Sequence, residues 1–294
     1  MSQGISKSYF SKLGANFSSL FYNGIGLLLI PRTLGPLNYG VFNFLTEYFN
    51  NYFIFASLGT DMAFFTALSS DSKNKKLIKY FILFTAVTIF ISIMIFIIFY
   101  HTSLVKYVFP DQSGKNIILA FIYSVLFYLF TKFRNYNDSI GFTAKTDKYI
   151  ILQRILGLVI LLGLFHKQLL TLETLFFQHF IILVLIIIVW LIFHLSQKDQ
   201  IVKNNEKLNK SEFLKISKSI YEYSRPLFFY LLVSITCIIV DRYLLQIYGG
   251  GNQQGYYSFS YRLSTFIIMF TTAMTPIFTR EFSMANSDND KDKM

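Results

Sequence analysis

Long apolar runs constrain this sequence more than any other feature. Hydrophobic residues make up 53% of the 294 residues and charged residues only 15%, and most of the apolar mass falls in runs of about 20 residues. One soluble core cannot enclose that many runs, whereas a helix of this length crosses a hydrocarbon layer of about 30 Å. Lipid gives the backbone no hydrogen-bond partner, and no alternating barrel pattern is present. The sequence therefore predicts an all-α, polytopic integral membrane protein.

Eight transmembrane helices are predicted from these runs. They cover residues 12–32, 40–66, 78–100, 116–136, 149–166, 172–195, 223–247 and 255–280. The spans and their connections divide the chain into four parts. Residues 1–195 form a first lobe, 196–222 a lysine-rich cytoplasmic linker or surface helix, 223–283 the start of a second lobe, and 284–294 a polar tail that we expect to be disordered.

Lysine and arginine are distributed unevenly between the two sides of these spans. Of the 27 basic residues, 21 fall on the side of the N-terminus, two (Arg242 and Arg262) fall within spans, and four fall on the other side: Arg32, Lys106, Lys115 and Lys167. Because cytoplasmic loops are enriched in Lys and Arg, this division predicts that both termini are cytoplasmic. It also accounts for the net charge of +11 without nucleic acid as a partner.

Polar and charged side chains are concentrated in four of the eight spans. They are Asn16 and Asn23 in the first, Asn43, Glu47, Asn50 and Asp61 in the second, Asp241 and Arg242 in the seventh, and Arg262 in the eighth. An ionised group facing lipid at mid-span costs at least about 2.5–3.5 kcal/mol. These faces are therefore expected to line an aqueous cavity. The alternative is that the charged groups form buried ion pairs that only fix helix packing.

Two outer connections repeat each other at a constant offset in the sequence. Gly35 and Gly40 after the first span correspond to Gly250 and Gly255 after the seventh, and Phe44 corresponds to Phe259. Both connections join two polar spans on the same side of the membrane. The seventh span is therefore predicted to open a second lobe with the same orientation as the first, an arrangement found in transporters.

The same offset pairs Glu47 with Arg262. Opposite charges at equivalent depths in two lobes predict a salt bridge across the cavity, which would act as a gate by breaking in one conformation. Asp61 and Asp241 are the other candidates for gating or for coupling to a cation.

The first connection and the last two spans resemble those of a known family. Residues 30–42 have the sequence IPRTLGPLNYGVF, and DRY at 241–243 is followed by GYYS at 255–258 and YRLS at 261–264. In this order and spacing they resemble the oligosaccharide (O-antigen and capsule) flippases of the multidrug/oligosaccharidyl-lipid/polysaccharide exporter superfamily. Such flippases have 12–14 helices, so a chain with eight predicted spans is expected to be a truncated two-lobe flippase.

The resemblance implies a protein of the bacterial inner membrane with two helical bundles around a central cavity. Its cargo would be a polyprenyl-diphosphate-linked oligosaccharide, moved to the outer leaflet by alternating access, and polysaccharide assembly enzymes would be possible partners beside membrane lipids. Arg32, Arg242 and Arg262 are, by position, the candidates for binding the diphosphate, because a guanidinium stays charged and donates two parallel hydrogen bonds. For Arg32, an interfacial anchor is the alternative.

The sequence shows no catalytic or cofactor motif. It has no P-loop, and His179 and His194, which share a span, are too far apart for a helical metal site. We therefore expect no enzymatic activity, cofactor or metal. Two other functions remain open: a membrane polysaccharide polymerase or glycosyltransferase, which would usually need a large outer loop or an acidic catalytic loop, and a cation-coupled small-molecule exporter of the same superfamily.

Overall fold

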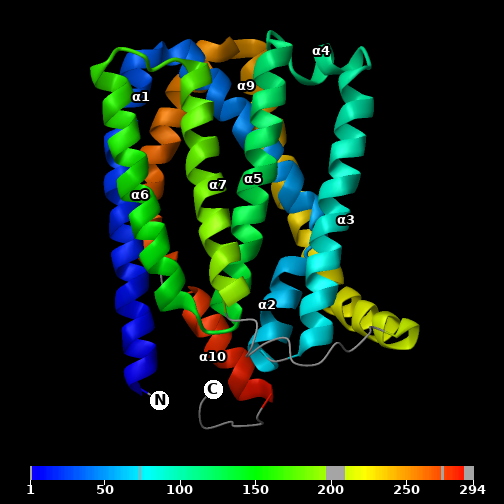
Figure 1. The fold of residues 1–294 in the computed structure, drawn as a ribbon. Coiled ribbons are helices and arrows are strands. Elements are labelled where there is room, and N and C mark those ends of the chain that lie inside the picture. Colours follow the sequence, from blue (N-terminus) through cyan, green and yellow to red (C-terminus); the bar gives the residue numbers. More distant parts are fainter. Residues whose placement is uncertain (1, 73, 197–208, 273–274, 288–294) are drawn as a thin grey trace.

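The computed structural model describes residues 2–72, 74–196, 209–272 and 275–287, and their regular secondary structure is entirely helical (Figure 1). The all-α prediction is therefore confirmed for these residues. The helices are α1 (Ser2–Ala56), α2 (Thr60–Ser70), α3 (Lys75–Tyr100), α4 (Leu104–Val108), α5 (Gly114–Ser139), α6 (Thr143–His166), α7 (Leu172–Ser196), α9 (Lys210–Thr272) and α10 (Thr275–Ser287).

Several of these helices are long and apolar enough to cross a membrane. Helices α3, α5, α6, α7 and α9 pass this test in the described residues, and the bent pair α1–α2 gives a sixth candidate. Much of their surface is apolar and faces outward, as Phe90 on α3 and Val159 on α6 illustrate. Such surfaces suit a lipid environment. The chain thus has the construction of a multi-pass membrane protein.

Helices α1 and α9 each turn back on themselves at a glycine. Gly35 has φ 73° and ψ 166°, and Gly250 has φ 65° and ψ −173°. This backbone conformation is essentially restricted to glycine. Both helices turn at the same end of the molecule and then run back toward the other end (Figure 1). The predicted first span therefore lies in the first arm of α1 and the second begins in its returning arm, and the seventh and eighth spans are placed in the same way on α9.

A second break follows the returning arm of α1. Helix α1 ends at Ala56 and α2 begins at Thr60, with a bend of 59°, so the predicted second span (40–66) is not one straight helix. Helix α9 is described to Thr272 and α10 from Thr275, and residues 273–274 lie outside the described residues. The two glycine turns agree with the internal repeat predicted from the sequence, and we call α1 with α2 the first repeat and α9 with α10 the second repeat.

Two predicted boundaries differ from the structure. Helix α10 continues to Ser287, which is inside the tail predicted as disordered; residues 288–294 lie outside the described residues. In the predicted linker, residues 197–208 also lie outside them, and residues 210–222 are the first part of α9. This part is docked on α3, because Glu212 pairs with Lys76 at 2.5 Å and Ser217 is hydrogen-bonded to Tyr80 at 2.8 Å.

The main core lies where the returning arm of α1 packs against α5 and α7. Phe44 and Leu45 of α1, Ala120 of α5 and Phe176 of α7 have no exposed side-chain surface. Aromatic rings contribute much of this packing, and Phe96 of α3 stacks on Phe121 of α5 with ring centres 3.9 Å apart. This packing fixes the side of α1 that faces the cavity described below.

Candidate functional site

A cavity of about 210 Å³ lies between α1, α5, α6 and α7, and Arg262 on the returning arm of α9 borders it. Its walls combine aromatic rings with amides and charged groups, which is the usual composition of a binding site for a polar ligand. The polar side chains that line it are Tyr22, Asn23, Tyr39, Thr46, Glu47, Asn50, Tyr123, Gln153, Arg154, His179 and Arg262.

The cavity contains two guanidinium groups and one carboxylate. Nη2 of Arg262 donates to Oδ1 of Asn43 at 2.7 Å. The guanidinium of Arg154 lies 5.1 Å from the centre of the Tyr22 ring, and its buried Nε has no hydrogen-bond partner in the part of the chain that the structure describes. Among the described residues, no ion pair joins Glu47 to either arginine. The cavity therefore has an excess of positive charge and a free guanidinium donor, which favours an anionic ligand.

The structure brings five of the predicted site residues together. Asn23, Glu47, Asn50 and Arg262 line the cavity, and Asn43 is buried beneath it as the partner of Arg262. Asn16 is half-buried on α1, outside the lining. Arg32 and Asp241 are exposed, Arg32 close to the Gly35 turn and Asp241 on the other arm of α9 from Arg262.

Arg242 is buried, but its partners are other residues of α9. Its Nη1 donates to Oγ of Ser258 at 2.6 Å and to Oε1 of Gln254 at 3.4 Å. The guanidinium also lies 4.5 Å from the ring centre of Tyr257 and 5.6 Å from that of Tyr261. Arg242 thus links the two arms of α9 and does not line the cavity.

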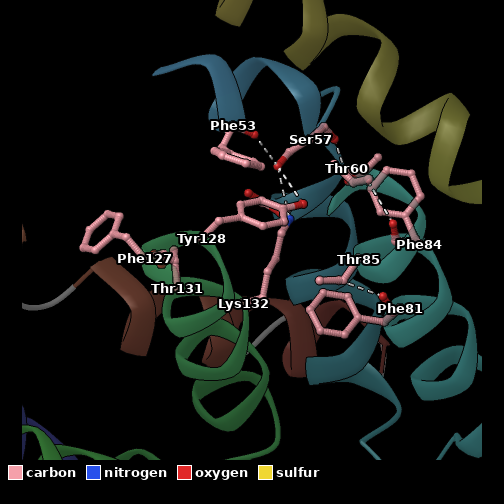
Figure 2. Close-up of polar contacts among 12 residues, drawn as sticks. Phe53, Ser57, Thr60, Phe81, Phe84, Thr85, Phe127, Tyr128, Thr131 and Lys132 are labelled. Carbon is pink, nitrogen blue, oxygen red and sulfur yellow. Dashed lines mark hydrogen bonds and ion pairs between the residues drawn. The ribbon is translucent and has the colours of Figure 1, made fainter. Parts of the chain in front are cut away.

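Asp61 is paired with a buried lysine at the break between α1 and α2. Lys132 of α5 is 2% exposed; its Nζ pairs with the Asp61 carboxylate and donates to Oγ of Ser57 at 3.2 Å. Figure 2 shows Lys132 extending from α5 toward Ser57 beside Tyr128, whose ring centre is 4.7 Å from Nζ. This pair holds the start of α2 against α5.

The two glycine turns pack against each other at one end of the molecule. A methyl group on Gly40 would collide with the carbonyl oxygen of Gly251, and one on Gly255 would collide with that of Pro36. Pro36 and Gly251 are themselves equivalent positions of the two repeats, so the contact is reciprocal. We call this contact the glycine crossing. At the other end of the molecule, α2 and α10 pack together. The two repeats therefore contact each other at both ends of the structure.

Arg154 and His179 are cavity residues that sequence reasoning missed. The charge count placed Arg154 on the cytoplasmic side, although it falls inside the predicted span 149–166. An arginine at that depth is itself a signal of a functional site. His179 bonds the carbonyl of Leu175 through Nδ1 and contacts the rings of Phe42 and Tyr123. No sequence pattern distinguishes it from the other histidines.

Comparisons with known proteins show the fold alone. No family model and no curated protein matches this sequence. A solved structure named only "protein A" matches with a TM-score of 0.61 at 14% sequence identity. The match covers 96% of this chain and 66% of that structure's chain, so this chain spans just under two-thirds of the length of its structural neighbour.

Proposed function

We propose that this protein moves a polyprenyl-diphosphate-linked oligosaccharide, an O-antigen or capsule unit, from the cytoplasmic to the outer leaflet of a bacterial inner membrane. The observation that carries the proposal is the cavity that Arg154 and Arg262 share with one carboxylate. Two guanidinium groups match the charge and the oxygen geometry of a diphosphate. The neighbouring tyrosines and amides offer the stacking surfaces and hydrogen bonds that sugars require.

The positions of the repeats support transport by alternating access. The glycine crossing would be the outer gate, and the α2–α10 contact the inner one, with both termini in the cytoplasm. Asn43 and Glu47 are one helical turn apart on α1, and Arg262 now bonds Asn43. A short shift of the returning arm of α9 would exchange Asn43 for Glu47 as the partner of Arg262. In this proposal the exchange accompanies gating.

Deleting the gene from the organism that encodes it and restoring defined variants tests the proposal. The variants are Arg154→Gln and Arg262→Gln, with Arg32→Gln as a matched control because Arg32 is exposed and outside the cavity lining. A hydrogen bond to a charged group contributes about 1.5–3 kcal/mol, so each cavity variant should lower surface polysaccharide by about 10- to 150-fold at equal protein level. The control should restore it.

The position of the blocked intermediate separates the proposal from its alternatives. Loss of a flippase leaves lipid-linked units in the inner leaflet, whereas loss of a polymerase leaves single units on the cell surface. The proposal is wrong if the deletion leaves surface polysaccharide unchanged, if single units accumulate outside, or if both cavity variants transport normally. Normal polysaccharide with increased sensitivity to small toxic compounds would instead indicate an exporter.

A further inference from the structure

A buried cluster of three charged residues lies outside the cavity, where α1, α5 and α6 meet. Nζ of Lys12 on α1 bonds Oδ2 of Asp138 at the end of α5 at 2.8 Å and Oδ1 of Asp147 at the start of α6 at 3.4 Å. The three residues are 1%, 4% and 0% exposed, respectively. Two carboxylates on different helices thus converge on one ammonium group.

The cluster has more acceptors than the protein can satisfy. Oδ1 of Asp138 and Oδ2 of Asp147 are buried and have no hydrogen-bond partner among the described residues. The charged groups that face Asp147 are Lys12 from α1 and Asp138 and Arg134 from α5. Arg134 adds positive potential, but among the described residues no ion pair joins it to either carboxylate. A buried oxygen left without a donor costs about 1–3 kcal/mol, and more if it is charged.

We propose that Asp138 and Asp147 together bind one exchangeable proton and that this cluster is a proton-binding site. Adding a proton to one carboxylate gives a carboxylic acid, which removes one of two like charges and supplies an O–H donor where the structure has unsatisfied acceptors. Because the two acids share an ammonium group, the proton belongs to the pair. A metal ion is the poorer match, since the ammonium already occupies the point on which both carboxylates converge, and metals need several oxygen ligands.

The site connects proton binding to the position of α1. Lys12 is on the arm of α1 that leads to the Gly35 turn, and α1 also packs extensively on α9. Release of the proton adds repulsion between Asp138 on α5 and Asp147 on α6, and so changes the contacts that hold Lys12 and this arm of α1 in place. The proton site does not depend on the transport activity proposed above, and its test measures no transport.

Infrared spectroscopy of the purified protein in nanodiscs tests the proposal directly. The wild type should show the carbonyl stretch of a buried carboxylic acid near neutral pH, shifted in heavy water. Asp147→Asn and Asp138→Asn each leave a single carboxylate with Lys12, so each should lose this band. The control is Glu173→Gln, since Glu173 forms an exposed pair with Lys115, and it should keep the band.

Thermal unfolding between pH 5 and 8 gives a second readout. A folded state that holds one proton more than the unfolded state becomes less stable as pH rises, by about tenfold in the unfolding constant per pH unit. Each Asn variant should fold and lose this extra dependence. The proposal is overturned if the wild type lacks the band, if both Asn variants keep it, or if sodium ions at constant pH stabilise the wild type and not Asp147→Asn.

Discussion

The two repeats share one backbone course but differ in their surroundings. Both have a glycine turn followed by a returning arm. Phe42 is 5% exposed, whereas Tyr257 at the equivalent position is 39% exposed. Thr46 and Tyr261 differ in the same way, at 4% and 48%. The turn is thus a local property of glycine, whereas burial of the arm depends on α5 and α7, which pack on the first repeat.

The repeats also differ in how they accommodate charge. Leu27 and Arg242 are equivalent and equally buried, at 7% each. Arg242 finds its partners close by in the sequence, in Gln254, Tyr257, Ser258 and Tyr261 of the same helix. Asp61 in the first repeat is paired with Lys132, 71 residues away on another helix. Charges in the first repeat therefore depend on the assembled bundle, and Arg242 in the second depends mainly on its own helix.

The largest effect is expected where a first-repeat charge loses its distant partner. Asp61→Asn leaves Lys132 buried without a counter-charge, which should cost about 3 kcal/mol, the lower end of the range for buried pairs because the Asp61 side chain is 32% exposed. Unfolding of the purified protein in mixed micelles measures this cost.

Replacing the other partner of the pair, by Lys132→Met, is the matched comparison. It leaves the partly exposed Asp61 able to be solvated, so it should cost less than Asp61→Asn. Equal costs, or a larger cost for Lys132→Met, would show that the pair does not hold the break in the way described.

A smaller effect, about 1–3 kcal/mol, is expected at the glycine crossing. Gly40→Ala and Gly255→Ala each place a methyl group against a backbone carbonyl that cannot yield without separating α1 from α9. If the contact is reciprocal, the two variants should have similar costs, and the double variant should cost less than their sum because either methyl already separates the helices.

Gly24→Ala is the control for this pair. It lies on the first arm of α1 with no neighbouring atom within 4 Å of an added methyl, so it should not destabilise the protein, and the higher helix propensity of Ala should stabilise it by up to about 1 kcal/mol. Additive costs in the double variant, or a large effect at one glycine alone, would contradict a reciprocal crossing.

Features encoded by neighbouring residues could be predicted from the sequence. The apolar runs predict the long helices, and the spacing of Gly35, Gly40, Gly250 and Gly255 predicts the repeat and the position of both turns. These features depend on backbone conformation and on periodicity within a short segment. The 59° break before α2 was not predicted, although Gly59 is in the left-handed conformation there, because a glycine within an apolar run is compatible with a continuous helix.

Features that join distant residues could not be predicted from one sequence. Lys12 and Lys132 contribute to the cytoplasmic charge count as if both were solvated, yet each is buried with an acid from another helix. Arg242 was predicted to line the cavity because it lies on a polar span. A sequence pattern identifies the polar side of a helix, but it does not show what that side contacts. Only the packing of α5 and α6 against α1 shows that Arg154, rather than Arg242, is the second cavity arginine.

The smallest effect is expected in the second repeat, at the ring that covers Arg242. Tyr257→Leu retains an apolar side chain of similar length but removes the aromatic face 4.5 Å from the guanidinium, which should cost about 0.5–1 kcal/mol. Tyr256→Leu is the control, since Tyr256 is the adjacent residue, is 59% exposed, and is not one of the rings that cover Arg242.

The double substitution Tyr257→Leu, Arg242→Leu should cost no more than Arg242→Leu alone, because the ring then has no cation to cover. Equal effects of Tyr257→Leu and Tyr256→Leu would mean that Gln254 and Ser258 alone satisfy Arg242. Charge in the second repeat would then be stabilised by hydrogen bonds across the turn, without a contribution from the exposed rings.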